Sequence, residues 1–294
     1  MPQDRNQSPG APKRVFPMQR IKRTITSVGT AFIVPLSCLA GITPQAGLGT
    51  MMSWMHGFAP DKGQGTAMPA TLAACFAFGA GAAARVLTLH TGKIGYHPSD
   101  FALALGVFVA VTLGALFVLK VAASLQHRLP RRPVLFIGVI LGVFAASAAT
   151  HSADVSGSVK IYELHGPLQI LLAAVAAGAL TQITGLASGT LLVPALFFLT
   201  RLSAVESVLI STLVVGLASI LPNMGYARKG LTEVEYARPA AWTAVIVGVP
   251  TGYYAGGFND RLVLLTYAVM AMFFAAREIA KVAVQAAPTG PDLR

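Results

Sequence analysis

The chain has 294 residues, of which 54% are apolar and only 11% are charged, and its formal net charge is +11. Soluble proteins carry about 25% charged residues, so this composition excludes an ordinary soluble fold. The positive charge would also suit nucleic-acid binding, but the chain has no module that combines basic and aromatic residues, and we expect no nucleic-acid partner.

Asp, Glu, Lys and Arg are absent from eight long stretches of the chain. A helix needs about 20 apolar residues to cross the hydrocarbon of a bilayer, where unpaired charges are expensive. We therefore predict an all-α, polytopic integral membrane protein with about eight hydrophobic segments, surrounded by the lipid bilayer. The stretches are residues 24–60, 63–84, 101–119, 133–153, 164–200, 207–227, 239–259 and 262–276.

Residues 1–23 are basic and rich in Pro, Gln and Ser, which is typical of a disordered segment. Basic residues collect at the cytoplasmic ends of membrane spans, so we predict that this tail is cytoplasmic. The apolar run that follows suits a signal peptide, but it continues to Pro60 without a convincing cleavage site, and we interpret it as retained. Residues 283–294 form a second tail, which we also expect in the cytoplasm.

The first long stretch, residues 24–60, is interrupted by glycines and by Pro44. A straight helix of this length would run about 55 Å, whereas the hydrocarbon is about 30 Å thick. Gly and Pro break helices, and freed backbone groups are tolerated at membrane depth only where protein or a water-filled cavity satisfies them. We therefore predict two half-helices with a break at Pro44. His56, later in the stretch, is either a hydrogen-bonded packing residue or a proton relay.

The order of the stretch lengths restarts after residue 163, which predicts two repeats of one architecture. The first repeat covers residues 24–153, a loop covers residues 154–163, and the second repeat covers residues 164–282. The second repeat also starts with a long stretch, residues 164–200, whose break we predict near Gly-rich sequence and Pro194. Such repeats are common in transporters.

Each long stretch either crosses the membrane or enters and returns as a hairpin. The hairpin arrangement is favoured because it leaves more basic residues on the cytoplasmic side. The residues that it moves inside are chiefly Lys120, Arg128, Arg131 and Arg132. Each half then has an odd number of crossings, so the repeats are inverted, and we expect the two breaks to meet near the midplane.

Small and polar residues surround both predicted breaks and form the predicted substrate site. Half-helix N-termini offer free N–H groups and a positive dipole end, which suit an anion, and hydroxyl and amide side chains add donors. Capping of the broken helices explains the same residues equally well. The candidate binding residues are Thr43, Gln45, Gly47, Gly49, Thr50, Gln182, Thr184, Gly185, Ser188, Gly189 and Thr190.

The sequence contains no catalytic constellation. No zinc-protease or serine-hydrolase motif, no phosphate-binding loop with Lys and no pair of buried carboxylates is present, so we expect no enzyme activity, metal or cofactor. Cys38 and Cys75 are interpreted as small packing residues. Gly248, Gly252 and Gly256 recur at four-residue spacing, which predicts close packing against another helix.

Residues 178–194 read GALTQITGLASGTLLVP, and Ser211-Thr212-Leu213 and residues 226–230 follow at the next span. With the shorter Gly47-Leu48-Gly49-Thr50 in the first half, this pattern resembles the sulfite exporter TauE/SafE family, also called the toluene-sulfonate uptake permease family. The resemblance covers about residues 26–282. The family's hallmark is a Gly-rich turn followed by Pro in each of two repeated halves.

The resemblance implies a secondary transporter, or permease, for small sulfur-containing or organic anions such as sulfite and sulfonates. It implies a multi-pass protein of the bacterial inner membrane whose halves rock to expose the substrate alternately. The alternatives are an anion channel, and a membrane-embedded enzyme or scaffold without transport activity. Self-association into a homo-oligomer is left open.

Overall fold

The computed structural model describes residues 17–88, 98–121, 140, 142–143, 145–146, 167–184, 188–200 and 202–286. These residues are almost entirely helical and contain no β-strand, which confirms the all-α prediction for this part of the chain. The helices are α1 (Pro17–Leu39), α2 (Gln45–His56), α3 (Pro60–Thr88), α4 (Pro98–Val121), α8 (Pro167–Thr184), α9 (Ser188–Leu199), α10 (Ala204–Ala218), α11 (Ile220–Arg228), α12 (Val234–Ala255) and α13 (Asp260–Ala286).

Three helical segments are long and apolar enough to cross a membrane, counting the described residues alone. They are Pro60–Thr88, Pro98–Phe117 and Ala204–Arg228. They coincide with the predicted stretches at 63–84, 101–119 and 207–227, and they are compatible with a membrane protein. The predicted stretch at 133–153 lies almost wholly outside the described residues, as does the loop at 154–163.

The first and last helices extend several residues past the predicted boundaries of the two tails. Residues 17–23, assigned above to the disordered tail, form the first turns of α1, because Met18, Ile21 and Ile25 recur at helical spacing. At the other end, α13 continues to Ala286, past the predicted start of the C-terminal tail.

The first long stretch is broken as predicted. α1 ends at Leu39 and α2 begins at Gln45, with Pro44 directly ahead of it. Gly41 adopts a left-handed conformation with φ of 62°, and the Ile42 N–H donates to the carbonyl oxygen of Ser37 at 2.9 Å. This is the glycine-dependent ending that closes many helices, and here it turns the chain inside the protein.

The second long stretch is also divided, since α8 ends at Thr184 and α9 begins at Ser188. Pro194, however, lies inside α9, so the prediction that it breaks the helix is wrong. Proline removes the N–H that would bond to the carbonyl four residues earlier, which belongs to Thr190. The buried hydroxyl of Tyr267 in α13 donates to that carbonyl at 2.7 Å, and this replacement bond lets the helix continue.

Glycines bring pairs of helices into backbone contact. A Cβ at Gly252 of α12 would overlap the carbonyl oxygen of Phe78 in α3, and one at Gly248 would lie 2.9 Å from the Cβ of Ala77. The predicted packing role of these two glycines is confirmed. A Cβ at Gly114 of α4 or at Gly178 of α8 would likewise overlap a backbone carbonyl oxygen of the opposite helix. α4 and α8 therefore also pack closely.

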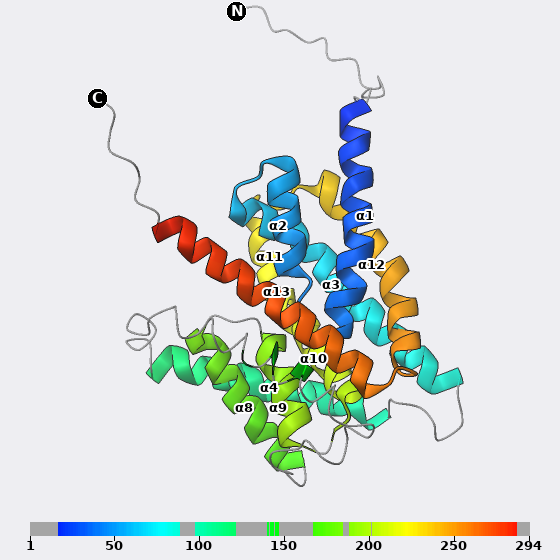
Figure 1. Cartoon of the computed structure of the whole chain (residues 1–294), viewed down its shortest axis with the longest axis vertical. Helices are drawn as coiled ribbons and strands as arrows, with labels where there is room; N and C mark the ends of the chain where they lie inside the picture. The colour runs from blue at the N-terminus through cyan, green and yellow to red at the C-terminus, as the bar shows by residue number, and fades with distance from the viewer. Residues whose placement is uncertain are drawn as a thin grey trace, which may run out of the picture.

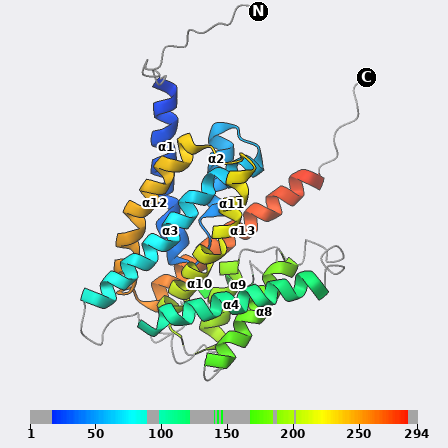
Figure 2. The same cartoon turned by 180° about the vertical axis from the view of Figure 1, so that it is seen from behind.

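The first helix of each half packs against a helix of the other half, and the second packs within its own half. α1 packs against α12 and α2 against α3, while α8 packs against α4 and α9 against α10. Figures 1 and 2 show α1, α2, α3 and α12 gathered in one part of the molecule and α4, α8 and α9 in the other. α10 lies between the two groups and contacts α3, α4 and α9. The first and second halves are therefore interleaved, and neither forms a separate domain.

Candidate functional site

The break after α1 contacts the start of α9. A Cβ at Gly189, in the first turn of α9, would overlap the carbonyl oxygen of Gly41 and would lie 3.0 Å from the Cα of Ile42. Only a residue without a side chain fits at this position. We call this contact between residues 40–44 and residues 188–190 the junction. It joins two segments that are far apart in the sequence, and both of them were predicted as breaks.

Helix α10 holds the end of α1 at the junction. The hydroxyl of Ser211 donates to the carbonyl oxygen of Gly41 at 2.8 Å, and that of Thr212 donates to the carbonyl oxygen of Cys38 at 3.2 Å. Both hydroxyl side chains are buried. The Cys38 carbonyl also accepts from the Gly41 N–H at 3.0 Å, so Thr212 adds a second bond there, whereas Ser211 supplies a partner for the Gly41 carbonyl beyond the end of the helix.

Ser211 and Thr212 were missing from the predicted site, although the pattern that carries the family resemblance includes them. The available signal was two adjacent hydroxyl residues inside the apolar stretch 207–227. A buried hydroxyl needs a hydrogen-bond partner, and it can bond to its own helix or to another element. The sequence does not distinguish these two cases.

The start of α2 lies at the junction. The N–H groups before Leu48 donate no hydrogen bond within the helix. The first such bond of the helix runs from the Leu48 N–H to the Pro44 carbonyl at 3.0 Å. Pro44 is the N-cap residue and makes no side-chain capping bond, while the hydroxyl of Thr43 accepts from the Gln45 N–H at 3.3 Å. Thr43 and Gln45 are both partly buried. The N–H groups of Ala46 and Gly47 are the donors that this helix start offers to an anion.

Three further predicted residues of α2 do not face the junction. Gly47 packs toward Ile33 of α1, and Gly49 packs against Gln64 of α3. Thr50 is exposed and donates to the Ala46 carbonyl of its own helix at 2.8 Å. Gly47 and Thr50 are three residues apart, so they lie on one face of α2 and both line an apolar groove between α1, α2 and α13, whereas Gly49 faces α3. The structure therefore does not bring these three residues together at the junction, and their binding role stays a prediction.

The second break contributes Gly189 and Thr190, which are buried, while Ser188 begins α9. Gln182 and Thr184 are described only as residues at the end of α8, and Gly185 lies outside the described residues. Of the predicted site residues, Gly189 is the one that the structure places directly against the first break, at Gly41 and Ile42.

His56 ends α2, at the opposite end of that helix from the junction. The Thr26 hydroxyl donates to the Lys22 carbonyl at 2.9 Å, so it accepts from Nε2 of His56, which lies 2.9 Å away. Nδ1 is buried and lacks a hydrogen-bond partner within the described residues. The imidazole stacks on Tyr236 with ring centroids 4.0 Å apart. His56 lies outside the three candidate spans, and burial, followed by the charge of Lys22, lowers its pKa.

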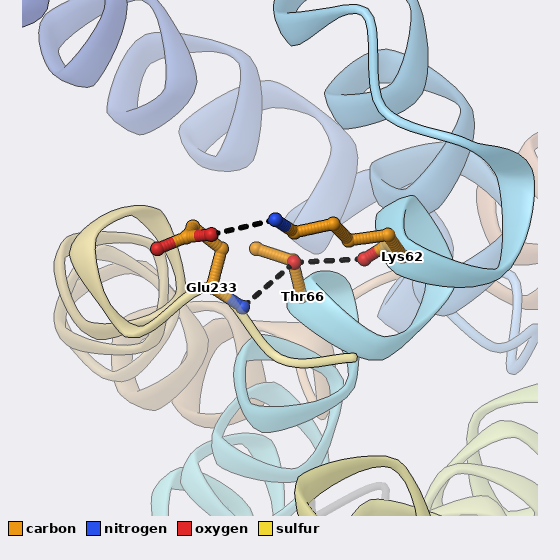
Figure 3. Close-up of polar contacts among 3 residues, drawn as sticks. All are labelled: Lys62, Thr66 and Glu233. Atoms are coloured by element: carbon orange, nitrogen blue, oxygen red, sulfur yellow. Dashed lines mark hydrogen bonds and ion pairs between the residues drawn. The ribbon is translucent and has the colours of Figure 1, made fainter. Parts of the chain in front are cut away.

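Two ion pairs surround the same end of the molecule and fasten the start of α12. Arg23 of α1 pairs with Glu235, and Lys62 of α3 pairs with Glu233 at 2.8 Å. Figure 3 shows that Thr66 lies between the second pair of residues: its hydroxyl donates to the Lys62 carbonyl at 2.8 Å and accepts from the Glu233 N–H at 3.1 Å. We call these side chains, together with His56 and Tyr236, the charged cluster.

Among the described side chains, no three His, Cys, Asp or Glu residues lie close enough together to hold a metal ion. No protein-family model, no curated protein and no solved structure matches the chain. A functional proposal therefore depends on the geometry of the junction and of the charged cluster.

Proposed function

We propose that the protein is a secondary transporter that moves small sulfur-containing or organic anions across the bacterial inner membrane. The observation that carries this proposal is the contact between the break after α1, at Gly41, and the start of α9, at Gly189. Transporters form substrate sites from discontinuous helices whose half-helix starts point at an anionic group. The choice of sulfite or sulfonates as substrate rests on the resemblance to the TauE/SafE family.

The packing of the helices supports two inverted repeats with about eight membrane segments. The order of the charge-free stretches makes α1 and α2 equivalent to α8 and α9, α3 equivalent to α10, and α4 equivalent to α12. Under this correspondence, the packing of α1 on α12 matches that of α8 on α4, and the packing of α2 on α3 matches that of α9 on α10. The contact between α3 and α10 then lies on the axis that relates the repeats.

The substrate anion would bind where the junction opens. The N–H groups of Ala46 and Gly47 supply donors from one break, and the first turn of α9 supplies donors from the other. In the described conformation Gly41 and Gly189 are in contact, so this state has the junction closed. Rocking of α9 with α8 and α4 away from the end of α1 would admit the anion. The charged cluster would hold α1 and α3 against α12 while the opposite side opens.

Transport of radioactive sulfite into liposomes that contain the purified protein tests the proposal. We expect saturable uptake that unlabelled sulfite or a small sulfonate inhibits, and loss of uptake in Gly189→Ala, whose Cβ would overlap the Gly41 carbonyl. Gly225→Ala is the matched control, because a Cβ there meets no atom within 4 Å. Uptake no faster than in protein-free liposomes, for sulfite, sulfonates and simple carboxylates alike, would refute the proposal. Single-channel currents in a planar bilayer would instead identify a channel.

A proton gradient tests coupling in the same liposomes. His56 is the candidate proton relay, since it belongs to the charged cluster and its buried Nδ1 has no hydrogen-bond partner among the described residues. We expect His56→Gln to remove stimulation by a pH gradient while anion exchange at equal pH continues. Equal stimulation in the variant and the unmodified protein would exclude this role for His56.

A further inference from the structure

Two apolar grooves on the outer face of the protein meet at Trp54. The larger has a volume of about 520 Å³ and lies between α1, α2 and α13, and the smaller, about 480 Å³, lies between α1 and α2. Trp54 of α2 lines both grooves and is 86% exposed. The residues of α1 that line them are Met18, Ile21, Lys22, Ile25, Ile33 and Leu36. We call the two together the Trp54 groove.

The dimensions and lining of the Trp54 groove fit a hydrocarbon chain. From Lys22 to Leu36 the groove follows α1 for about 21 Å. One leaflet of a bilayer contributes about 15 Å of hydrocarbon, so an acyl chain would occupy most of this length and leave the headgroup at the Lys22 end. The groove is walled by Met51 of α2 and by Val269 and Phe273 of α13. A chain in this groove would therefore contact three helices.

A positive charge lies at one end of the groove. Of the described residues that line the smaller groove, Lys22 alone is charged, and exposed Arg20 lies two residues away. Among the residues that the structure describes, the two ion pairs use Arg23 and Lys62, not Lys22. Basic residues at the edge of a membrane attract anionic lipid headgroups, and a lysine there extends its ammonium to the interface.

A second copy of the chain suits this surface less well. Two copies related by an axis perpendicular to the membrane would bring Lys22 and Arg20 of one copy near the same residues of the other. Like charges placed opposite each other disfavour association. An anionic lipid carries a negative charge, opposite to that of Lys22 and Arg20, and its hydrocarbon chain suits the apolar groove.

We propose that the Trp54 groove binds an anionic phospholipid, with one acyl chain along α1 and the phosphate at Lys22. The proposal requires the bilayer as surroundings but is independent of the transported substrate. It also identifies Trp54 as a natural reporter, since the chain has two Trp residues and the other, Trp242, lies on α12 and is 62% exposed.

Quenching of tryptophan fluorescence by brominated lipids tests this inference in liposomes. In Trp242→Phe only Trp54 emits, and we expect brominated phosphatidylglycerol to associate about fivefold more strongly near it than brominated phosphatidylcholine. Lys22→Gln should remove most of this preference, and Lys22→Arg should retain it. In Trp54→Phe, where Trp242 is the reporter, the two lipids should quench equally.

Equal quenching of Trp54 by the two lipids, or an unchanged preference in Lys22→Gln, would overturn the proposal. Protection of Trp54 from both lipids, with cross-linking between chains, would show that a second copy covers the groove and would overturn it as well. Because no anion flux is measured, a failed transport assay leaves these results unaffected.

Discussion

The hydroxyl of Tyr267 donates a 2.7 Å hydrogen bond to the carbonyl oxygen of Thr190, which Pro194 leaves without an intrahelical donor. Pro69 of α3 shows the same relationship at a second position. The carbonyl four residues before it, that of Gly65, accepts from the hydroxyl of Thr232 at 3.2 Å. In both cases a side chain from a distant part of the sequence supplies the bond that a proline removes from a helix.

Tyr267→Phe should destabilise the protein by about 1–3 kcal/mol, because it leaves a buried carbonyl without a partner. In Pro194→Ala the backbone N–H of residue 194 can bond to the Thr190 carbonyl, so Tyr267→Phe should cost much less in that background. Thermal unfolding of the four proteins in detergent measures this double-mutant cycle. Equal losses in the two backgrounds would show that the hydroxyl does not compensate for the proline.

Gly189→Ala should lower the unfolding temperature and abolish transport, because its Cβ would overlap the Gly41 carbonyl, which is backbone and cannot move aside alone. Gly225→Ala, in α11, meets no atom within 4 Å and replaces a helical glycine by a better helix former. Its stability should be unchanged or slightly increased. Thermal unfolding and sulfite uptake are measured on both variants, and similar behaviour of the two would argue against the junction.

A comparison of Gly41→Ala with Gly57→Ala separates the cost of a left-handed backbone from the cost of steric contact with neighbouring residues. Both glycines have left-handed backbone conformations, with φ of 62° and 66°, so an alanine at either position costs about 1–2 kcal/mol. A Cβ at Gly57 meets no atom within 4 Å, whereas one at Gly41 lies 3.3 Å from the Cα of Val208. The loss of stability should therefore be clearly larger for Gly41→Ala. A larger loss for Gly57→Ala would contradict the packing at the break.

Thr66→Val should destabilise the protein more than Lys62→Gln. The Thr66 hydroxyl is buried and accepts from the Glu233 N–H, so its loss leaves a backbone donor unsatisfied, at about 1–3 kcal/mol. The Lys62–Glu233 ion pair is more than one-third exposed on both sides, and such pairs contribute about 0–1 kcal/mol. Chemical or thermal unfolding of the two variants gives the order, and the reverse order would contradict this assignment.

His56 should make stability depend on pH in the mildly acidic range. The pKa of its imidazole is lowered by burial and by Lys22, so the unfolded chain binds a proton more readily than the folded one. Stability from this source is present above the unfolded pKa of about 6.5 and is lost as the pH falls below it. The unfolding temperature should therefore drop further between pH 7.5 and 5.5 in the unmodified protein than in His56→Gln. Parallel profiles would show that His56 contributes nothing.

Local signals in the sequence were sufficient to predict the helix breaks. Glycine and proline act on the backbone at their own positions, so the ends of α1 and α8 could be placed within a few residues from the sequence alone. Pro194 was misassigned because Tyr267, whose hydroxyl replaces the hydrogen bond that the proline removes, lies 73 residues further along the sequence. The N-terminal boundary of α1 was missed because composition suggested disorder, whereas the spacing of Met18, Ile21 and Ile25 favoured a helix.

The direction in which each side chain points could not be predicted from the sequence. The residue types at positions 47, 49 and 50 suited a binding site, but whether they face α1, α3 or the exterior depends on how α2 is rotated against its neighbours. Ser211 and Thr212 were likewise visible only as polar residues in an apolar stretch. Their partners, the carbonyls of Gly41 and Cys38, are backbone groups that carry no sequence signature.

Cys38 and Cys75 are both buried, with no more than 1% of either residue exposed, and they are the only two cysteines in the chain. Water-soluble maleimides cannot reach thiols in such positions while the protein is folded. New cysteines at exposed positions can thus be labelled selectively without first replacing the native pair. In intact cells and inverted vesicles, such single-site labelling would establish on which side of the membrane each loop lies.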